Sequence, residues 1–234
     1  MKVLITGTSS GVGRAAAEKF LSKGYNVVGF DIKPSTIKHE KYEHYIVDVR
    51  HPENFPEIEG IWYIVNNAGI VTPKAEAIAV NQQGYINIIK KYGYDPQLKS
   101  LLIISSTCVE KGLDNIEYCS SQGARNALVR WCTTNFSADE RHVLCNGISL
   151  DGIVPSDDDS GIGGTSMEPE LYSRPELMNQ IKELSILKRL TTVEEIAEWV
   201  YFFTAVNTCV TGEIIHIDGE LPNFSFVKYP GWDD

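Results

Sequence analysis

The start of the chain constrains its fold most strongly, because a short β-branched run there leads through a glycine-rich turn into a helix-length segment. The run covers Val3 to Thr6, and Gly7, Gly11 and Gly13 lie in the turn. Such glycines permit a tight turn and let the backbone approach a pyrophosphate, which the N-terminus of the next helix attracts. A plain strand-to-helix turn is the alternative. The predicted dinucleotide-binding residues of this loop are Gly7, Ser9, Ser10, Gly11, Val12 and Gly13.

Asp31 supports the dinucleotide interpretation, because it lies at the end of the second predicted strand, 18 residues after the last glycine of the loop. Dinucleotide folds place a ribose-binding carboxylate at a spacing of about 20 residues. A carboxylate accepts a hydrogen bond from a 2′-hydroxyl and repels a 2′-phosphate, which favours NAD over NADP. Lys33 and Arg14 argue for NADP, and an ordinary turn residue is the alternative role of Asp31. By the same reasoning, Asp48 and Val49 are candidates for holding the adenine edge.

Short β-branched runs alternate with helix-length segments along the rest of the chain. Strands separated by helices imply right-handed crossovers and a parallel sheet covered on both faces. We therefore predict one α/β domain over residues 1–234, with a Rossmann-type doubly wound parallel sheet of about seven strands. The last helix should begin after Thr192 as its N-cap. The expected strands are Val3 to Thr6, Asn26 to Asp31, Tyr45 to Val47, Ile61 to Asn66, Leu101 to Ser105, Val143 to Ser149 and Glu213 to Ile217, and the expected helices lie near 12–23, 76–91, 118–137, 169–186 and 193–205.

The composition argues against several classes of partner and site. A formal net charge of -10 disfavours a surface that tracks phosphates, so nucleic acid and anionic membranes are poor partners. Five cysteines without a C-x-x-C pair predict reduced thiols, with neither a disulfide nor a zinc site. The acidic run Asp157 to Asp159 presents too few oxygen ligands for a hard cation, so no metal is expected. The N-terminus lacks a signal-peptide pattern and no apolar run reaches about 18 residues, which predicts a soluble cytoplasmic protein.

Further motifs follow the glycine loop in a fixed order. They are Asn66-Asn67-Ala68-Gly69, Asn81 within Val80-Asn81-Gln82-Gln83-Gly84, Ile104-Ser105-Ser106, Tyr118, Gly152-Ile153-Val154-Pro155-Ser156 and Val210-Thr211-Gly212. With these motifs the chain closely resembles the short-chain dehydrogenase/reductase family from Met1 to about Gly219. The resemblance implies an oxidoreductase that moves a hydride between a nicotinamide cofactor and an alcohol or carbonyl carbon.

The resemblance also implies roles for individual residues. Tyr118 would donate or accept the proton, and Ser106 would bond to the reacting oxygen. Ser105 remains the alternative serine, because its spacing of thirteen residues to Tyr118 is the more usual one. Asn81 would join a proton relay through a water molecule. The expected cofactor contacts from these motifs are Asn67, Ala68, Gly69, Tyr118, Gly152, Val154 and Ser156.

Gln122 occupies the position at which the family motif Tyr-x-x-x-Lys has its lysine. It lies one helical turn after Tyr118, so it can face the same cleft and hold a ribose hydroxyl. It offers hydrogen bonds but no charge, whereas a lysine would favour the phenolate of the tyrosine. Arg125, seven residues after Tyr118, falls on the same face of the helix and could restore some positive potential. Pairing of Arg125 on the surface is the interpretation that the sequence favours.

Two functions remain open at the level of sequence. The first is an NAD-dependent oxidoreductase that acts on a small-molecule alcohol or carbonyl compound with reduced dependence on the lysine. The second is a dinucleotide-binding sensor or regulatory protein with weak or no turnover. Retention of Tyr118, Asn81 and the serine favours the enzyme. A lid segment near 155–187 would shape the substrate pocket, and the resemblance implies a homo-oligomer, either a dimer or a tetramer.

Overall fold

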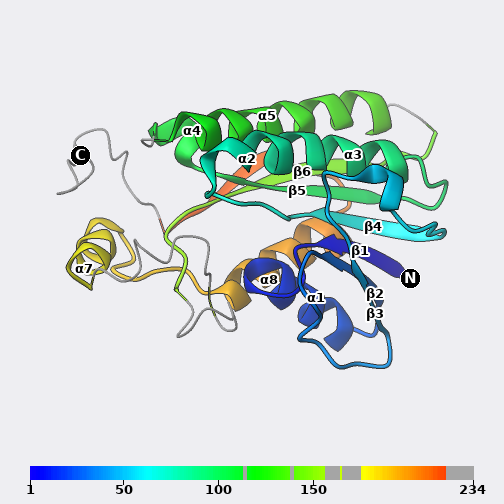
Figure 1. Cartoon of the computed structure of the whole chain (residues 1–234), viewed down its shortest axis with the longest axis horizontal. Helices are drawn as coiled ribbons and strands as arrows, with labels where there is room; N and C mark the ends of the chain where they lie inside the picture. The colour runs from blue at the N-terminus through cyan, green and yellow to red at the C-terminus, as the bar shows by residue number, and fades with distance from the viewer. Residues whose placement is uncertain (113–114, 138–139, 156–163, 165–174, 220–234) are drawn as a thin grey trace.

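A computed structural model of the protein describes residues 1–112, 115–137, 140–155, 164 and 175–219. These residues form a seven-stranded parallel sheet with helices on both faces (Figure 1). The strand order is β3-β2-β1-β4-β5-β6-β7. The chain therefore adds β2 and β3 on one side of β1, and then crosses over to add β4 to β7 on the other side. The predicted doubly wound α/β fold is confirmed. The strands are β1 (Lys2–Thr6), β2 (Asn26–Asp31), β3 (Tyr42–Ile46), β4 (Ile61–Asn66), β5 (Ser100–Ser106), β6 (Leu144–Leu150) and β7 (Ile214–Ile217).

Alternate side chains of the central strands fill two separate cores. In β1, Val3 and Ile5 belong to the core that contains residues of α1 (Gly11–Ser22) and α8 (Val193–Tyr201), whereas Leu4 belongs to the other core. This alternation follows from the two-residue period of a β-strand. Every residue of β5 is buried, as expected for a central strand with helices on both sides.

The helices lie in two layers (Figure 1). α1 and α8 cover one face of the sheet, and α2 (Lys74–Ile78), α3 (Gly84–Tyr92) and α5 (Ile116–Cys132) cover the other, with the short α4 (Cys108–Lys111) next to α5. The predicted N-cap of α8 is confirmed as part of a capping box. The Thr192 hydroxyl accepts from the Glu195 N–H at 3.2 Å, and the Glu195 carboxylate accepts from the Thr192 N–H at 3.0 Å.

Several boundaries differ from the predicted ones. β3 begins at Tyr42 rather than Tyr45, because this edge strand is largely half-exposed and does not form an apolar run. The single helix predicted over 76–91 begins earlier and is divided by a π turn, Ala79–Gln83. α5 also begins two residues earlier than predicted and passes into a second π turn, Thr133–Ser137. No sequence pattern indicated the four-residue α4.

The predicted lid falls only partly within the described residues. α7 (Pro175–Leu184) is the described part of the helix expected near 169–186. Ser156 and most of the segment before α7 lie outside the described residues. The substrate-shaping role of this segment therefore stays a prediction.

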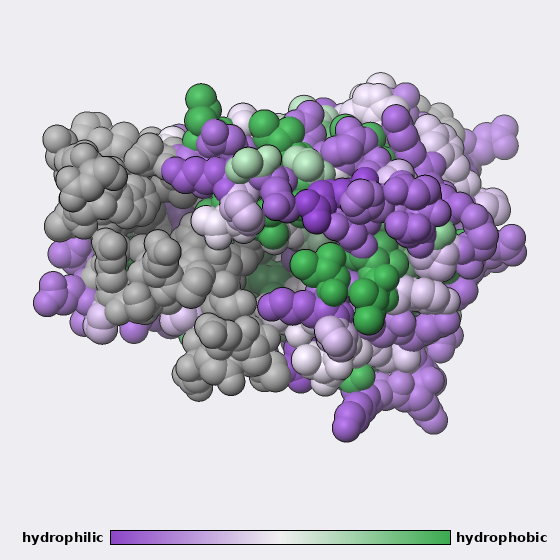
Figure 2. Space-filling view, in the orientation of Figure 1, coloured by the Kyte–Doolittle hydropathy of each residue, from purple (hydrophilic) through white to green (hydrophobic). Residues whose placement is uncertain are grey.

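Hydrophilic residues predominate on the face of the molecule seen in Figure 2, and apolar residues gather there in small groups. Within the ranges that the structure describes, no helix is both long enough and apolar enough to span a bilayer. The homo-oligomer and the cytoplasmic location stay predictions.

Candidate cofactor and catalytic site

The glycine loop between β1 and α1 has a backbone that side chains would obstruct. Gly7 and Gly11 have φ angles of 78° and 56°, a region that L residues with a side chain rarely adopt. A Cβ at Gly13 would lie 2.1 Å from the Gly7 carbonyl oxygen and 2.6 Å from Nδ2 of Asn67. Glycine at these positions therefore allows close packing of the loop against the residues after β4.

Asp31, at the end of β2, holds the glycine loop from the side. One carboxylate oxygen accepts from the Ser9 N–H and the other from the Lys33 N–H, both at 2.9 Å. Ser9 is further fixed because its hydroxyl donates to the Lys33 carbonyl and its carbonyl accepts from the Thr36 hydroxyl. Each carboxylate oxygen has a second lone-pair position, so Asp31 retains capacity to accept from a ligand hydroxyl. The sequence did not predict this structural role.

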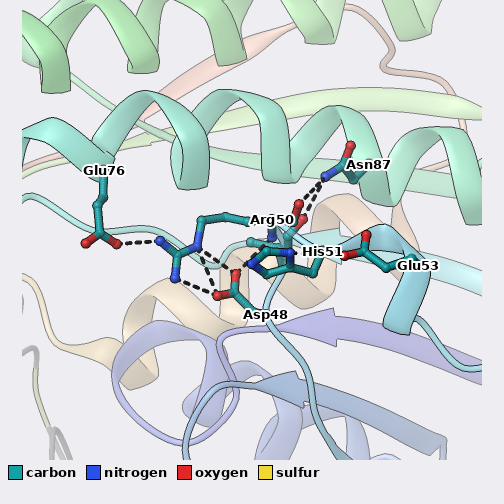
Figure 3. A network of polar contacts seen from close by, with 7 residues as sticks. Asp48, Arg50, His51, Glu53, Glu76 and Asn87 are labelled. Carbon is teal, nitrogen blue, oxygen red and sulfur yellow. Dashed lines mark hydrogen bonds and ion pairs between the residues drawn. The ribbon is translucent and has the colours of Figure 1, made fainter.

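Asp48 takes part in an ion-pair network (Figure 3). The Arg50 guanidinium donates to both carboxylate oxygens of Asp48, and it also contacts Glu76 at 2.5 Å. Hydrogen bonding from Arg50 lowers the pKa of Asp48 below its ordinary value. Asn87 of α3 donates to the Val49 carbonyl at 2.9 Å, which fixes the backbone between Asp48 and Arg50. Sequence reasoning singled out Asp48 and Val49 but missed Arg50, although an arginine two residues after an aspartate was a usable signal.

The Asn66-Asn67-Ala68-Gly69 segment is attached to the end of β1. The Thr6 hydroxyl accepts from the backbone N–H groups of Asn67 and Ala68, each at 2.9 Å. The Asn67 side chain donates to the Thr6 carbonyl at 2.9 Å, and the buried Asn66 donates to the Tyr85 carbonyl at 3.2 Å. These bonds place Asn67, Ala68 and Gly69 beside the glycine loop, at the carboxyl edge of the sheet.

Asn81 lies in the π turn between α2 and α3, where it joins the loop after β4 to α5. Its Oδ1 accepts from the Ile70 N–H at 2.9 Å, and its Nδ2 donates to the Ile70 carbonyl at 2.8 Å and to the Ser121 hydroxyl at 3.1 Å. The side chain is fully buried. The water-mediated proton relay through Asn81 stays a prediction.

Tyr118 lies in the first turn of α5 and is partly exposed. The Asn115 side chain caps this helix by accepting from the Tyr118 N–H at 2.9 Å, which fixes the backbone of the tyrosine. The cap was not recognised in the sequence, although asparagine before a helical segment is a usual N-cap signal.

The two serines at the end of β5 have different neighbours. The Ser105 hydroxyl donates to the Gln122 carbonyl at 3.3 Å, so its proton is engaged with the backbone of α5. The Ser106 Oγ accepts from the Cys108 N–H at 3.3 Å. A hydroxyl has one donor and two acceptor positions, so this contact does not use the Ser106 proton, although the Ser106 hydroxyl also interacts with the Cys108 thiol.

Gln122 and Arg125 are both buried on the inner side of α5, with exposed fractions of 1% and 3%. The Arg125 guanidinium donates to Oε1 of Gln122 at 3.1 Å. The interpretation that Arg125 pairs on the surface is therefore wrong. Sequence spacing put the residue on the correct face of α5, but it did not show that the side chain folds inward between α5 and the loop after β4.

The loop after β6 is held by a neighbouring segment. Gly152 has a φ of 57°, its carbonyl accepts from the Thr191 N–H at 2.8 Å, and the Val154 N–H donates to the Thr191 carbonyl at 2.9 Å. Asp151, directly before Gly152, accepts from Lys111 at 3.2 Å. Lys111 also pairs with Asp218 at 2.9 Å. These contacts give Gly152 and Val154 a fixed backbone at the carboxyl edge of the sheet.

Comparisons with known proteins agree with this architecture. The family model described as Enoyl-(Acyl carrier protein) reductase matches residues 7–220. L-xylulose reductase of Caenorhabditis elegans is 25% identical, over 95% of this chain and 96% of the relative. The 3-oxoacyl-(acyl-carrier-protein) reductase FabG of Aquifex aeolicus is 23% identical, over 93% of this chain and 96% of the relative. Ligand-free aldohexose dehydrogenase of Thermoplasma acidophilum superposes with a TM-score of 0.78 at 25% identity, over 98% of this chain and 96% of that structure.

Proposed function

The chain belongs to the short-chain dehydrogenase/reductase family and is an oxidoreductase of that type, and we propose that it interconverts an alcohol and a carbonyl compound with NAD(H). The observation that carries this proposal is the buried amide of Gln122, one helical turn after Tyr118. Its Nε2 has no hydrogen-bond partner among the described residues. A buried donor without a partner costs free energy, so a polar ligand at this position would stabilise the site.

The residues present fit a dinucleotide. Gly7 and Gly13 let the loop pack closely against the residues after β4, and the N-terminus of α1, which begins at Gly11, adds a positive dipole end that favours a pyrophosphate. Ser9, Ser10 and Val12 are the other residues of this loop that we propose contact the pyrophosphate. Asn67, Ala68 and Gly69 would line the opposite side, and Gly152, Val154 and Ser156 would contact the nicotinamide carboxamide.

We propose NAD rather than NADP as the preferred cofactor because Asp31 lies beside the loop. Its carboxylate is fixed by two backbone donors, which keeps its negative charge at the end of β2. That charge would accept from a ribose 2′-hydroxyl and repel a 2′-phosphate. Asp48 and Val49 are proposed for the adenine edge, with Arg50 holding the Asp48 carboxylate in place.

Tyr118 is the proposed acid and base. Its hydroxyl would take the proton of the alcohol during oxidation and return a proton to the carbonyl oxygen during reduction. The proposed partner is Ser106, whose hydroxyl would donate to the reacting oxygen, with Ser105 retained as the alternative. When bound, the nicotinamide would accept or supply the hydride. Asn81 would hold the loop and α5 in register for this proton transfer.

The test is turnover together with cofactor binding. Purified protein would be assayed for absorbance change at 340 nm with NAD, NADH, NADP and NADPH against alcohols and carbonyl compounds. Sugars and polyols come first, since two of the relatives are named for xylulose and aldohexose, and a 3-oxoacyl thioester follows. We expect turnover that Tyr118→Phe and Ser106→Ala reduce strongly while NADH binding persists. Loss with Ser105→Ala instead would reassign the serine.

The regulatory alternative predicts a different result from the same experiment. A dinucleotide sensor would bind NADH in a fluorescence titration yet show no turnover with any of these substrates, and Tyr118→Phe would then change nothing. The enzymatic relatives favour the oxidoreductase.

A further inference from the structure

Arg125 is a buried cation in the proposed catalytic site. All five of its N–H donors are used. Nε donates to the Asn81 carbonyl at 2.9 Å, Nη1 to the Ile104 carbonyl and to Gln122 Oε1 at 3.1 Å each, and Nη2 to the Ala68 carbonyl at 3.1 Å and to Asn81 Oδ1 at 2.9 Å. These acceptors come from the loop after β4, the π turn before α3, β5 and α5, so the guanidinium lies where those elements meet.

Every one of these acceptors is a neutral oxygen. Within the part of the chain that the structure describes, no carboxylate forms an ion pair with Arg125. The ring of Tyr85 lies 3.9 Å from the guanidinium carbon and adds a cation–π contact. Burying a charge without a counter-ion is costly. An anion that forms nearby during function would offset that cost.

The contact with Arg125 also sets the orientation of the Gln122 amide. A guanidinium has donors only, so the amide must present its oxygen to Arg125 and its NH₂ group to the other side. That NH₂ group is buried and has no acceptor among the described residues. Gln122 is therefore oriented with its NH₂ group as a buried donor, one helical turn after Tyr118.

We propose that Arg125 and Gln122 act together in place of the lysine of the family motif. Arg125 supplies the positive potential that favours the Tyr118 phenolate and orients Gln122, and the Gln122 NH₂ group donates to a ribose hydroxyl of the bound cofactor. Gln122 is a cofactor-binding residue in this arrangement, and Arg125 is a positioning and electrostatic residue. The inference rests on the proposed function.

The electrostatic environment agrees with this arrangement. Burial lowers the pKa of Arg125, while negative charge on Tyr85, Tyr118 or Cys108 acts in the opposite direction. Tyr85 does not supply that anion at neutral pH, because burial raises its pKa to about 12. Burial likewise raises the pKa of the Cys108 thiol, so it stays neutral. Tyr118 is the remaining partner among these three, and an interaction that favours the guanidinium favours the phenolate equally.

The first test uses Gln122→Glu, which keeps the shape of the side chain. The new carboxylate would pair with Arg125, so the fold is retained while the positive potential is neutralised and the amide donor is lost. We expect the dissociation constant of NADH to rise about tenfold or more, as for loss of one hydrogen bond to a buried donor. The ionisation midpoint of Tyr118, from ultraviolet difference spectra against the matching Tyr118→Phe proteins, should rise by at least about one pH unit. Gln97→Glu is the matched control, because Gln97 accepts from Trp62 at the surface.

The second test moves the charge instead of removing it. Arg125→Leu should raise the Tyr118 midpoint, and adding Gln122→Lys to that variant should bring it back toward wild type. Arg130→Leu, on the same helix, is the control for losing an arginine outside the site. Should Arg125→Leu fail to fold, the Gln122→Glu measurements decide alone.

The outcomes distinguish this inference from the proposed function. An unchanged midpoint and unchanged NADH affinity in Gln122→Glu would overturn the roles of both residues. If Tyr118→Phe still abolished turnover in the same preparation, the oxidoreductase proposal would stand without them. Absence of turnover in wild type, together with a shifted midpoint in Gln122→Glu, would instead contradict the proposed function and leave the proposed roles of Arg125 and Gln122 standing.

Discussion

Gln122→Lys would recreate the family motif, and we expect it to destabilise this protein rather than activate it. Gln122 is buried, and its Oε1 lies 3.1 Å from Nη1 of Arg125. An ammonium group at the end of a lysine placed there would lie about 4 Å from the guanidinium. Two like charges at that distance repel by about 4 kcal/mol at an effective dielectric constant of about 20. This is a large fraction of the 5–15 kcal/mol that usually stabilises a domain, on the order of a third.

The same repulsion predicts a specific dependence on pH. About 4 kcal/mol corresponds to about three pKa units, so the introduced lysine should have a folded-state pKa near ~7 against ~10.4 in the unfolded chain. Between these values the unfolded state binds more protons, so the free energy of unfolding rises with pH. The deficit relative to wild type should be full below about pH 7 and should shrink steadily toward about pH 10.

Urea denaturation at pH 7 and pH 9.5 would measure this effect in a double-mutant cycle of Gln122→Lys and Arg125→Leu. The cycle separates the repulsion from the cost of losing the Arg125 hydrogen bonds. We expect a coupling free energy of about 4 kcal/mol at pH 7 that falls at pH 9.5. A coupling below about 1 kcal/mol, or a deficit that is equal at the two pH values, would refute the placement of a charged Arg125 beside Gln122.

Four further predictions concern the glycine loop and the fold. Gly13→Ala should abolish NADH binding and lower the free energy of unfolding by about 1–3 kcal/mol, because its methyl group would meet a backbone oxygen at 2.1 Å. Gly123→Ala is a matched helical control, since its methyl group would have nothing within 4 Å. Equal NADH fluorescence titrations and equal urea denaturation curves for the two variants would contradict the role of the glycine loop. Asp31→Asn keeps an acceptor for the loop but removes the charge, so the ratio of NADP to NAD affinity should rise at least about tenfold in binding titrations, and an unchanged ratio would contradict the role of that charge. Thr192→Ala should cost about 1 kcal/mol without affecting NADH affinity. Hydrogen bonding from Arg189, and after it from the Thr192 backbone, lowers the pKa of Glu195 to about 2, so its contribution is present above about pH 4.5 and is lost as pH falls toward 2, a loss that acid titration of Glu195→Gln would not show.

Much of the sheet was predictable because its central strands are buried and read as apolar runs. The edge strand β7 is only half-buried but still carries three isoleucines, so all the strands except β3 were expected within one residue at either end. The edge strand β3 was misplaced because its half-exposed side chains carry no such run. The π turn at Asn81 was missed because a one-residue change in helical hydrogen bonding leaves the apolar period almost unchanged.

The site divides in the same way. The position of the glycine loop, Asp31 and the asparagine segment at the carboxyl edge of the sheet could be predicted because their residue types and spacing are tied to local backbone geometry, and their cofactor contacts stay predictions. The environment of Arg125 was not, since its acceptors at Ala68, Asn81 and Ile104 lie far apart in sequence. Helical spacing gives the face on which a side chain starts, and only the packing of other elements decides whether a long arginine turns inward or outward.

A crystal structure of the NADH complex would test the central claim most directly. The account predicts a ribose hydroxyl oxygen of the cofactor about 2.7–3.2 Å from the Gln122 amide nitrogen, with the amide oxygen still on Arg125 and Tyr118 facing the nicotinamide. It would be contradicted by a bound cofactor that leaves the Gln122 nitrogen without a contact, or by an Arg125 that has turned out of the site.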